Sequence, residues 1–129
     1  MLLAAERSLL LVVDVQQKLM PAIDDGAGVV ERIAWLVRVA QRIGVPVAAS
    51  EQYPQGLGPT VAPLSALLPR DAIATKNHFS CAAAGCLAQL PGGDRPQVVI
   101  VGVESHVCVL QSALGLAAEG REVFVVADA

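Results

Sequence analysis

The stretch that decides the fold runs from Val98 to Cys108 and reads Val-Val-Ile-Val-Gly-Val-Glu-Ser-His-Val-Cys. Its first four residues are β-branched and apolar, which is typical of a buried strand, and Gly102 ends that run. After Cys108, apolar residues recur at helical spacing. The stretch therefore predicts a strand that turns directly into a helix, which is the repeating unit of a parallel α/β sheet.

Cys108 is expected within the first turn of the predicted helix. Free backbone N–H groups and the positive end of the helix dipole favour an anion there. The pKa of a thiol in such a position can fall from about 8.5 to roughly 3.5–7.5, which would make Cys108 a candidate nucleophile at neutral pH. Free cysteine is also among the most buried residue types, so packing in the core is the alternative interpretation of this residue.

Two other predicted strands end in polar residues. The apolar run from Ser8 to Val13 ends in Asp14, and a shorter run, Ala72 to Thr75, ends in Lys76. In an open parallel sheet, ligands bind outside the carboxyl ends of the strands. An acid, an amine and a thiol are thus predicted at one edge of one sheet, and this combination favours a site over three unrelated surface or core residues.

Strand and helix patterns alternate along the whole chain. We expect strands at Leu9–Asp14, Val45–Ser50, Ala72–Thr75, Gln97–Val101 and Glu122–Ala127. Helices are expected at Ala27–Ile43, Pro63–Leu68, Ser80–Leu90 (with Ser80 as its cap) and from Cys108 to about Glu119. Continuous apolar strands indicate a parallel sheet covered on both faces, and the alternation predicts the strand order 3-2-1-4-5 with right-handed crossovers.

Composition narrows the class of protein. The chain has 129 residues, enough for one domain with a sizeable core. It is 54% hydrophobic but only 3% aromatic, so we expect an aliphatic core. A net charge of −3 without a basic cluster argues against a nucleic-acid partner. Apolar runs are interrupted before the ~18–20 residues that a membrane span needs, so no membrane partner is expected.

The numbers and spacing of cysteines and histidines indicate the cellular compartment and whether a metal site is expected. Three cysteines is an odd number, and Cys81 and Cys86 have neither a C-x-x-C nor a zinc spacing. The residues before the first strand do not resemble a signal peptide. We therefore expect a cytoplasmic protein with free thiols. No pair of histidines occurs with an acid at ligand spacing, so neither a metal nor another cofactor is expected.

Three ordered motifs together resemble the isochorismatase-like cysteine hydrolases. They are Val-Asp-Val-Gln around Asp14, Thr-Lys-Asn-His-Phe-Ser around Lys76, and Gly-Val-Glu-Ser-His-Val-Cys-Val around Cys108. The loop Glu51–Thr60 resembles most the subgroup called isochorismatase domain-containing proteins. The resemblance implies a three-layer α/β/α sandwich, an oligomer, and a catalytic triad with Asp14 as general acid/base, Lys76 as the amine and Cys108 as the nucleophile.

The resemblance also implies a cis peptide at Val103–Glu104 and an oxyanion hole formed by the backbone N–H groups of Glu104 and Cys108. The expected reaction is hydrolysis of a small amide, ureide or related acyl compound through a covalent intermediate on the cysteine. We expect a small-molecule substrate to be contacted by side chains from the strand ends and loops, namely Gln16, Tyr53, Leu57, Phe79, His106 and Val107.

The sequence departs from the family at three points. The nicotinamidase branch carries two histidines and an aspartate after its second strand, but Ser50–Thr60 contains no histidine. The branch that hydrolyses isochorismate lacks the cysteine, so Cys108 argues against that substrate. Family members usually continue beyond the equivalent of Asp128 with another helix and strand. We therefore expect one isochorismatase-like domain over residues 1–129 that is incomplete at its C-terminal end.

Two other classes of function stay open. The first is a non-catalytic binding or scaffold protein on the same fold, against which the retained triad argues. The second is a thiol redox protein that uses Cys108 with Cys81 or Cys86, although Cys86 falls among Ala and Leu, where packing is the more common role. His78 and His106 flank the triad residues and could line the pocket, or cap and pack.

Overall fold

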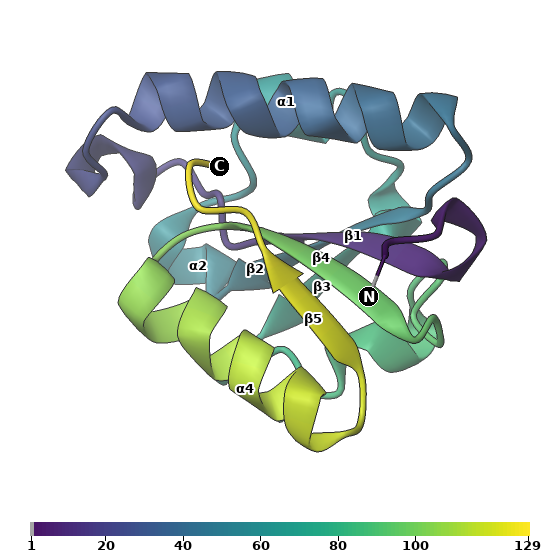
Figure 1. Cartoon of the computed structure of the whole chain (residues 1–129). Coiled ribbons are helices and arrows are strands. Elements are labelled where there is room, and N and C mark those ends of the chain that lie inside the picture. Colours follow the sequence, from purple (N-terminus) through teal and green to yellow (C-terminus); the bar gives the residue numbers. More distant parts are fainter. Residues whose placement is uncertain (1) are drawn as a thin grey trace.

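Parallel strands form the centre of the protein, in the order β3-β2-β1-β4-β5 (Figure 1). The computed structural model describes residues 2–129. Within that range the strands are β1 Ser8–Val13, β2 Val47–Gln52, β3 Ile73–Lys76, β4 Gln97–Gly102 and β5 Glu122–Val125. All neighbouring strands pair in parallel, which confirms the predicted sheet and its strand order.

One long helix covers each face of the sheet (Figure 1). Helix α1 spans Gly26–Arg42 and packs Ile33 and Val37 on one face, while α4 spans Leu110–Ala118 and packs Leu116 on the other. Every residue of β1 is buried, because its alternate side chains enter the two cores in turn. The expected layering of helices on both faces is therefore confirmed.

Shorter elements complete the chain. Helices α2 and α3 each form a single turn, at Pro54–Leu57 and Ala62–Ser65. The 3₁₀ turns are η1 Ala5–Arg7, η2 Met20–Ala22, η3 Arg70–Ala72 and η4 Cys86–Gln89. A π-helical turn, η5, spans Ser105–Val109 and continues directly into α4. None of the helices within residues 2–129 combines the length and the hydrophobicity needed to cross a bilayer.

The expected helix over Ser80–Leu90 is wrong. This segment forms turns followed by the short η4, so Cys86 begins a 3₁₀ turn instead of lying mid-helix. Gly85 explains the break, because its φ of 66° lies in the left-handed region, which does not continue an α-helix. Ser80 caps a turn instead of a helix, because the N–H of Ala83 donates to Ser80 Oγ at 3.1 Å.

The carboxyl ends of β1 and β4 approach each other closely at Gly102. This glycine pairs with Val13, and a Cβ built on it would collide with the carbonyl oxygen of Val13. Its φ of 124° is also one that L side chains rarely adopt. The N–H of Val103 then donates to that same oxygen at 2.9 Å. Gly102 thus brings the turn before η5 next to the residue that follows β1, Asp14.

We expect Gly102→Ala to lower the free energy of unfolding far more than Gly44→Ala. Gly44 also has a positive φ, of 80°, but a Cβ there would meet no atom within 4 Å. Its substitution should cost only the backbone strain, about 1–2 kcal/mol. Gly102→Ala adds a collision with backbone, which should cost at least about 1–3 kcal/mol more. Urea unfolding of both variants measures the difference, and equal losses would contradict this account of β1–β4 packing.

Candidate active site

An ion pair without solvent exposure lies at the carboxyl edge of the sheet. Asp14 directly follows β1, Lys76 ends β3, and β2 lies between the two strands. Lys76 Nζ is 2.7 Å from Asp14 Oδ2, and neither side chain has any exposed area. The structure therefore brings together the acid and the amine that the sequence placed at two separate strand ends.

Two residues at the carboxyl end of β2 form hydrogen bonds with this ion pair. Ser50 Oγ donates to Asp14 Oδ1 at 2.7 Å, and Lys76 Nζ donates to Gln52 Oε1 at 2.9 Å. The sequence analysis missed Ser50 and Gln52. Only Ser50 had a positional signal, because it ends the predicted second strand, which lies between the strands of Asp14 and Lys76 in the predicted order; Gln52 lies beyond that predicted end.

Backbone carbonyls complete the surroundings of the ammonium group. Lys76 Nζ lies 3.0 Å from the carbonyl oxygen of His78 and 3.3 Å from that of Phe79. Removing two charges from water costs several kcal/mol per ion, and such a pair persists only when further hydrogen bonds satisfy both groups. Here the residues after β3 wrap around the ammonium group and supply those bonds.

Asp14 leaves the strand with a left-handed backbone. Its φ is 53°, a conformation that few non-glycine residues adopt, although aspartate tolerates it better than most. Its N–H still donates to the carbonyl oxygen of Ser50 at 3.1 Å. The backbone hydrogen bond and the side-chain bond from Ser50 together hold the carboxylate at the edge of the sheet.

The thiol of Cys108 is buried beside this pair, with only 5% of the residue exposed. Burial, and then the nearby Asp14 carboxylate, raise its pKa to about 12, while Lys76 acts in the opposite direction. The expected lowering of this pKa by the helix start is therefore wrong. Desolvation and a neighbouring anion outweigh the partial charges of backbone N–H groups. At neutral pH the resting thiol keeps its proton.

The turn between β4 and η5 has the cis peptide at Val103–Glu104 that the resemblance implied. The Glu104 carbonyl accepts hydrogen bonds from the N–H groups of Val107 and Val109, each at 3.1 Å. These bonds tie the turn to the segment that carries Cys108. Among the residues that the structure describes, no protein group accepts a hydrogen bond from the Glu104 N–H.

Gln16 anchors the loop that follows β2. Its side chain is fully buried, and Nε2 donates to the carbonyl oxygens of Gln52 and Gly58 at 2.9 and 2.8 Å. Its Oε1 accepts from the Gln52 N–H at 2.8 Å. Glu51 closes the same loop, because its Oε2 accepts from both the N–H and the hydroxyl of Thr60, at 2.6 and 2.8 Å.

Two exposed aromatic residues contact Lys76 through their backbone groups. Tyr53 is 54% exposed, and its N–H donates to the Lys76 carbonyl at 3.0 Å. Its ring lies against Gly56, where a Cβ would collide with it. Phe79 is 56% exposed, and its carbonyl contacts the ammonium group. The other expected substrate contacts range from half-buried Leu57 and Val107 to exposed His106.

The remaining cysteines interact with each other. Cys81 has no exposed area, and its N–H donates to Ser112 Oγ at 2.9 Å. A hydrogen bond with Cys86, followed by burial, raises the pKa of the Cys81 thiol, and the same hydrogen bond lowers the pKa of Cys86. Both belong to the core beneath α4. No three His, Cys, Asp or Glu side chains of residues 2–129 converge as metal ligands.

Known proteins share the sequence pattern and the fold of this chain. Residues 8–129 match the family model of the isochorismatase domain. Isochorismatase domain-containing protein 2 of Danio rerio is 38% identical over 130 residues, which cover 98% of this chain and 64% of the relative. This chain thus spans less than two thirds of that relative's length.

Two solved structures share the fold. The MAR1 ribonuclease from Caenorhabditis elegans is 32% identical, with a TM-score of 0.84, and the match covers 98% of this chain and 65% of that one. The ycaC gene product of Escherichia coli, an octameric hydrolase of unknown specificity, is 25% identical, with a TM-score of 0.88. That match covers 98% of this chain and 64% of the other.

We expect Lys76→Met to destabilise the protein by about 3–5 kcal/mol, because it leaves the buried Asp14 carboxylate without its counter-charge. Arg7→Ala is the matched control. Arg7 pairs with Glu122 at 3.5 Å, but about half of its side chain is exposed, so its loss should cost less than about 1 kcal/mol. Chemical denaturation of both variants tests this difference. A loss below about 1 kcal/mol for Lys76→Met would show that the ion pair is not a buried, charged interaction.

Proposed function

Because the chain belongs to the isochorismatase domain family, we propose that it is a hydrolase with Cys108 as its nucleophile. In this proposal Asp14 is the general acid and base, and Lys76 is the amine of the triad. The observation that carries the proposal is the buried Lys76–Asp14 ion pair beside a buried thiol. Titratable groups that converge in this way, with a strongly shifted thiol pKa, are typical of catalytic sites.

The first half of the reaction forms a thioester. Asp14 accepts the proton of the Cys108 thiol while the sulfur attacks the carbonyl carbon of the substrate. The carbon–nitrogen bond then breaks, and Asp14 returns the proton to the departing nitrogen. A water molecule attacks the thioester in the second half. Asp14 takes a proton from that water and gives it back to the sulfur, so the thiol is regenerated and the product leaves as an acid.

Lys76 and Ser50 position the general base. Each donates to a different oxygen of the Asp14 carboxylate, at 2.7 Å in both cases. A carboxylate oxygen can accept two hydrogen bonds, so both oxygens keep a free acceptor position for the proton in transfer. Ser50 therefore acts as a positioning residue, because it acts through Asp14 and not on the substrate.

Backbone N–H groups at the turn before α4 would stabilise the developing oxyanion. The Glu104 N–H has no acceptor among the described residues, and the Cys108 N–H is the second donor of the proposed hole. Two such donors typically lower the barrier by a few kcal/mol. All these steps use side chains and backbone of this chain, so the proposed reaction needs no metal and no other cofactor.

The substrate proposed is a small amide, ureide or related acyl compound. Tyr53, Leu57 and Phe79 would supply apolar walls, with Val107 and His106 on the side of η5, which suits a small ligand oriented by few hydrogen bonds. Gln16 would act indirectly, because it holds the loop that carries two of these walls. The net charge of −3 favours such a substrate over nucleic acid, although the C. elegans structural relative is described as a ribonuclease.

We further propose that the protein self-associates and works in a reducing compartment such as the cytoplasm. The octameric state of the E. coli structural relative supports the first point. The three free cysteines, Cys81, Cys86 and Cys108, support the second.

Hydrolysis of a panel of small amides and ureides tests the proposed activity. We expect Cys108→Ala to lower kcat by at least about a thousandfold, and Ser50→Ala by about tenfold to a hundredfold without a matching rise in KM. Cys86→Ala is the matched control, because this cysteine is buried in the same core but outside the triad. It should keep near wild-type activity.

Two outcomes would contradict the proposed function. Full turnover by Cys108→Ala would show that Cys108 is not the nucleophile. A folded wild-type protein that binds members of the panel without turning them over would favour the scaffold function instead.

A further inference from the structure

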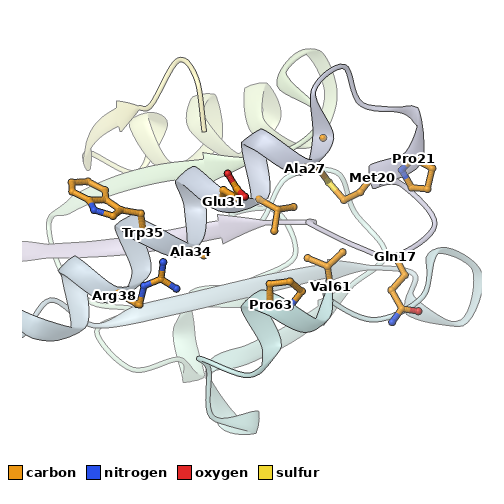
Figure 2. A pocket seen from close by; sticks show the side chains of 12 residues that line it. Gln17, Met20, Pro21, Ala27, Glu31, Ala34, Trp35, Arg38, Val61 and Pro63 are labelled. Carbon is orange, nitrogen blue, oxygen red and sulfur yellow. The ribbon is translucent and has the colours of Figure 1, made fainter.

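A groove of about 910 Å³ runs along one flank of α1 and contains no residue of the triad. Figure 2 shows its two sides, with α1 on one side and the segment with Val61 and Pro63 on the other. Gln17, Met20 and Pro21 close it near the start of the helix. Its lining is mostly apolar, with two charged side chains of opposite sign from α1.

The residues that α1 contributes form one stripe, which we call the α1 stripe. Their spacing of three and four residues places them on one flank of the helix. Besides Gly26, they are Ala27, Val30, Glu31, Ala34, Trp35 and Arg38. Within the stripe, Trp35 is 60% exposed and is the only tryptophan of the chain. The small side chain of the exposed Ala27 leaves room for another element to approach the helix, and Ala34, which is only 5% exposed, lines the bottom of the groove.

The two charges of the α1 stripe have no partner within the described chain. Both Glu31 and Arg38 are exposed, and neither forms an ion pair with any of residues 2–129. They lie seven residues apart, which corresponds to two turns and a separation of about 10.5 Å along the helix. One negative and one positive charge at this spacing complement an identical helix that runs in the opposite direction.

We propose that the α1 stripe pairs with the α1 stripe of a second copy of this chain, antiparallel about a two-fold axis. With the axis between positions 34 and 35, Glu31 faces Arg38 of the second copy, and Arg38 faces its Glu31. The same register places the exposed Trp35 of each copy over the groove of the other at Ala34, whose small side chain is almost fully buried and so leaves room for the indole. Two ion pairs thus flank two tryptophan contacts at the centre of the interface.

The proposed register explains why the groove takes a second copy and not an unrelated partner. Every contact in it is self-complementary, as a two-fold interface requires, and aromatic side chains packed at the centre typically carry most of the binding energy. One wall of the groove also follows directly on the loop Glu51–Thr60, because Val61 comes after Thr60. This inference rests on the proposed self-association and is independent of the hydrolytic chemistry.

Sedimentation velocity over a range of protein concentrations tests the interface. Arg38→Glu and Glu31→Arg each place like charges opposite one another at two symmetric contacts, so each should weaken self-association by about tenfold or more. Arg70→Glu is the matched control, since Arg70 is exposed but does not line the groove. It should associate like the wild type.

Mixing the two single variants makes the test specific. A heterodimer of Arg38→Glu with Glu31→Arg has opposite charges at both contacts, so the mixture should associate although each variant alone does so poorly. The emission of Trp35 should shift to shorter wavelength in the same samples, because association buries the indole. Circular dichroism verifies that each variant is folded.

The proposal is overturned if the wild type stays monomeric at every concentration. It is also overturned if the wild type associates but the single variants associate equally well, because another surface then forms the contact. A mixture that associates no better than its components excludes the antiparallel register. In each case the amide panel still reports separately on the hydrolytic function, since none of these substitutions lies in the triad.

Discussion

The ion pair between Lys76 and Asp14 requires three strands to be placed correctly at once. Both side chains are fully buried, so the cost of removing two charges from water has to be offset by their attraction and by hydrogen bonds from neighbours. Strand β1 supplies the acid, β3 the amine, and β2 the Ser50 hydroxyl and Gln52 amide that complete the network. A buried pair of this kind is weak evidence for stability, and its retention favours a chemical role.

Burial and the Asp14 carboxylate together set the state of the thiol. Cys108 lies near the start of a helix, where a lowered pKa is common, yet burial and then the carboxylate beside it favour the protonated form. The protonated resting state fits the proposed mechanism, because there the nucleophilic thiolate forms only when Asp14 takes the thiol proton during attack. Lys76 then holds the carboxylate in place. Its positive charge also opposes the negative charge that would otherwise build up on Asp14 and on the sulfur.

Much of the architecture could be predicted because it follows from local patterns. Buried strands correspond to apolar runs in the sequence, and the polar residues that end these runs mark one edge of the sheet. Asp14 and Lys76 could be predicted for this reason. The helix expected after Ser80 did not form, since Gly85 adopts a left-handed backbone that spacing alone does not reveal. The Ser50 and Gln52 contacts and the raised thiol pKa depend on distances across strands that are far apart in sequence.

The pH dependence of Cys108 alkylation by iodoacetamide, followed by peptide mass spectrometry, tests the central claim most directly. Alkylation requires the thiolate, and the pKa of Cys108 is raised to about 12, so the thiolate fraction grows only as pH approaches that value. The account predicts a rate that keeps rising, close to tenfold per pH unit, from pH 7 to about pH 10. A rate that reaches its plateau below about pH 8 would mean that the resting site holds a thiolate, and would contradict Asp14 as the acceptor of the thiol proton.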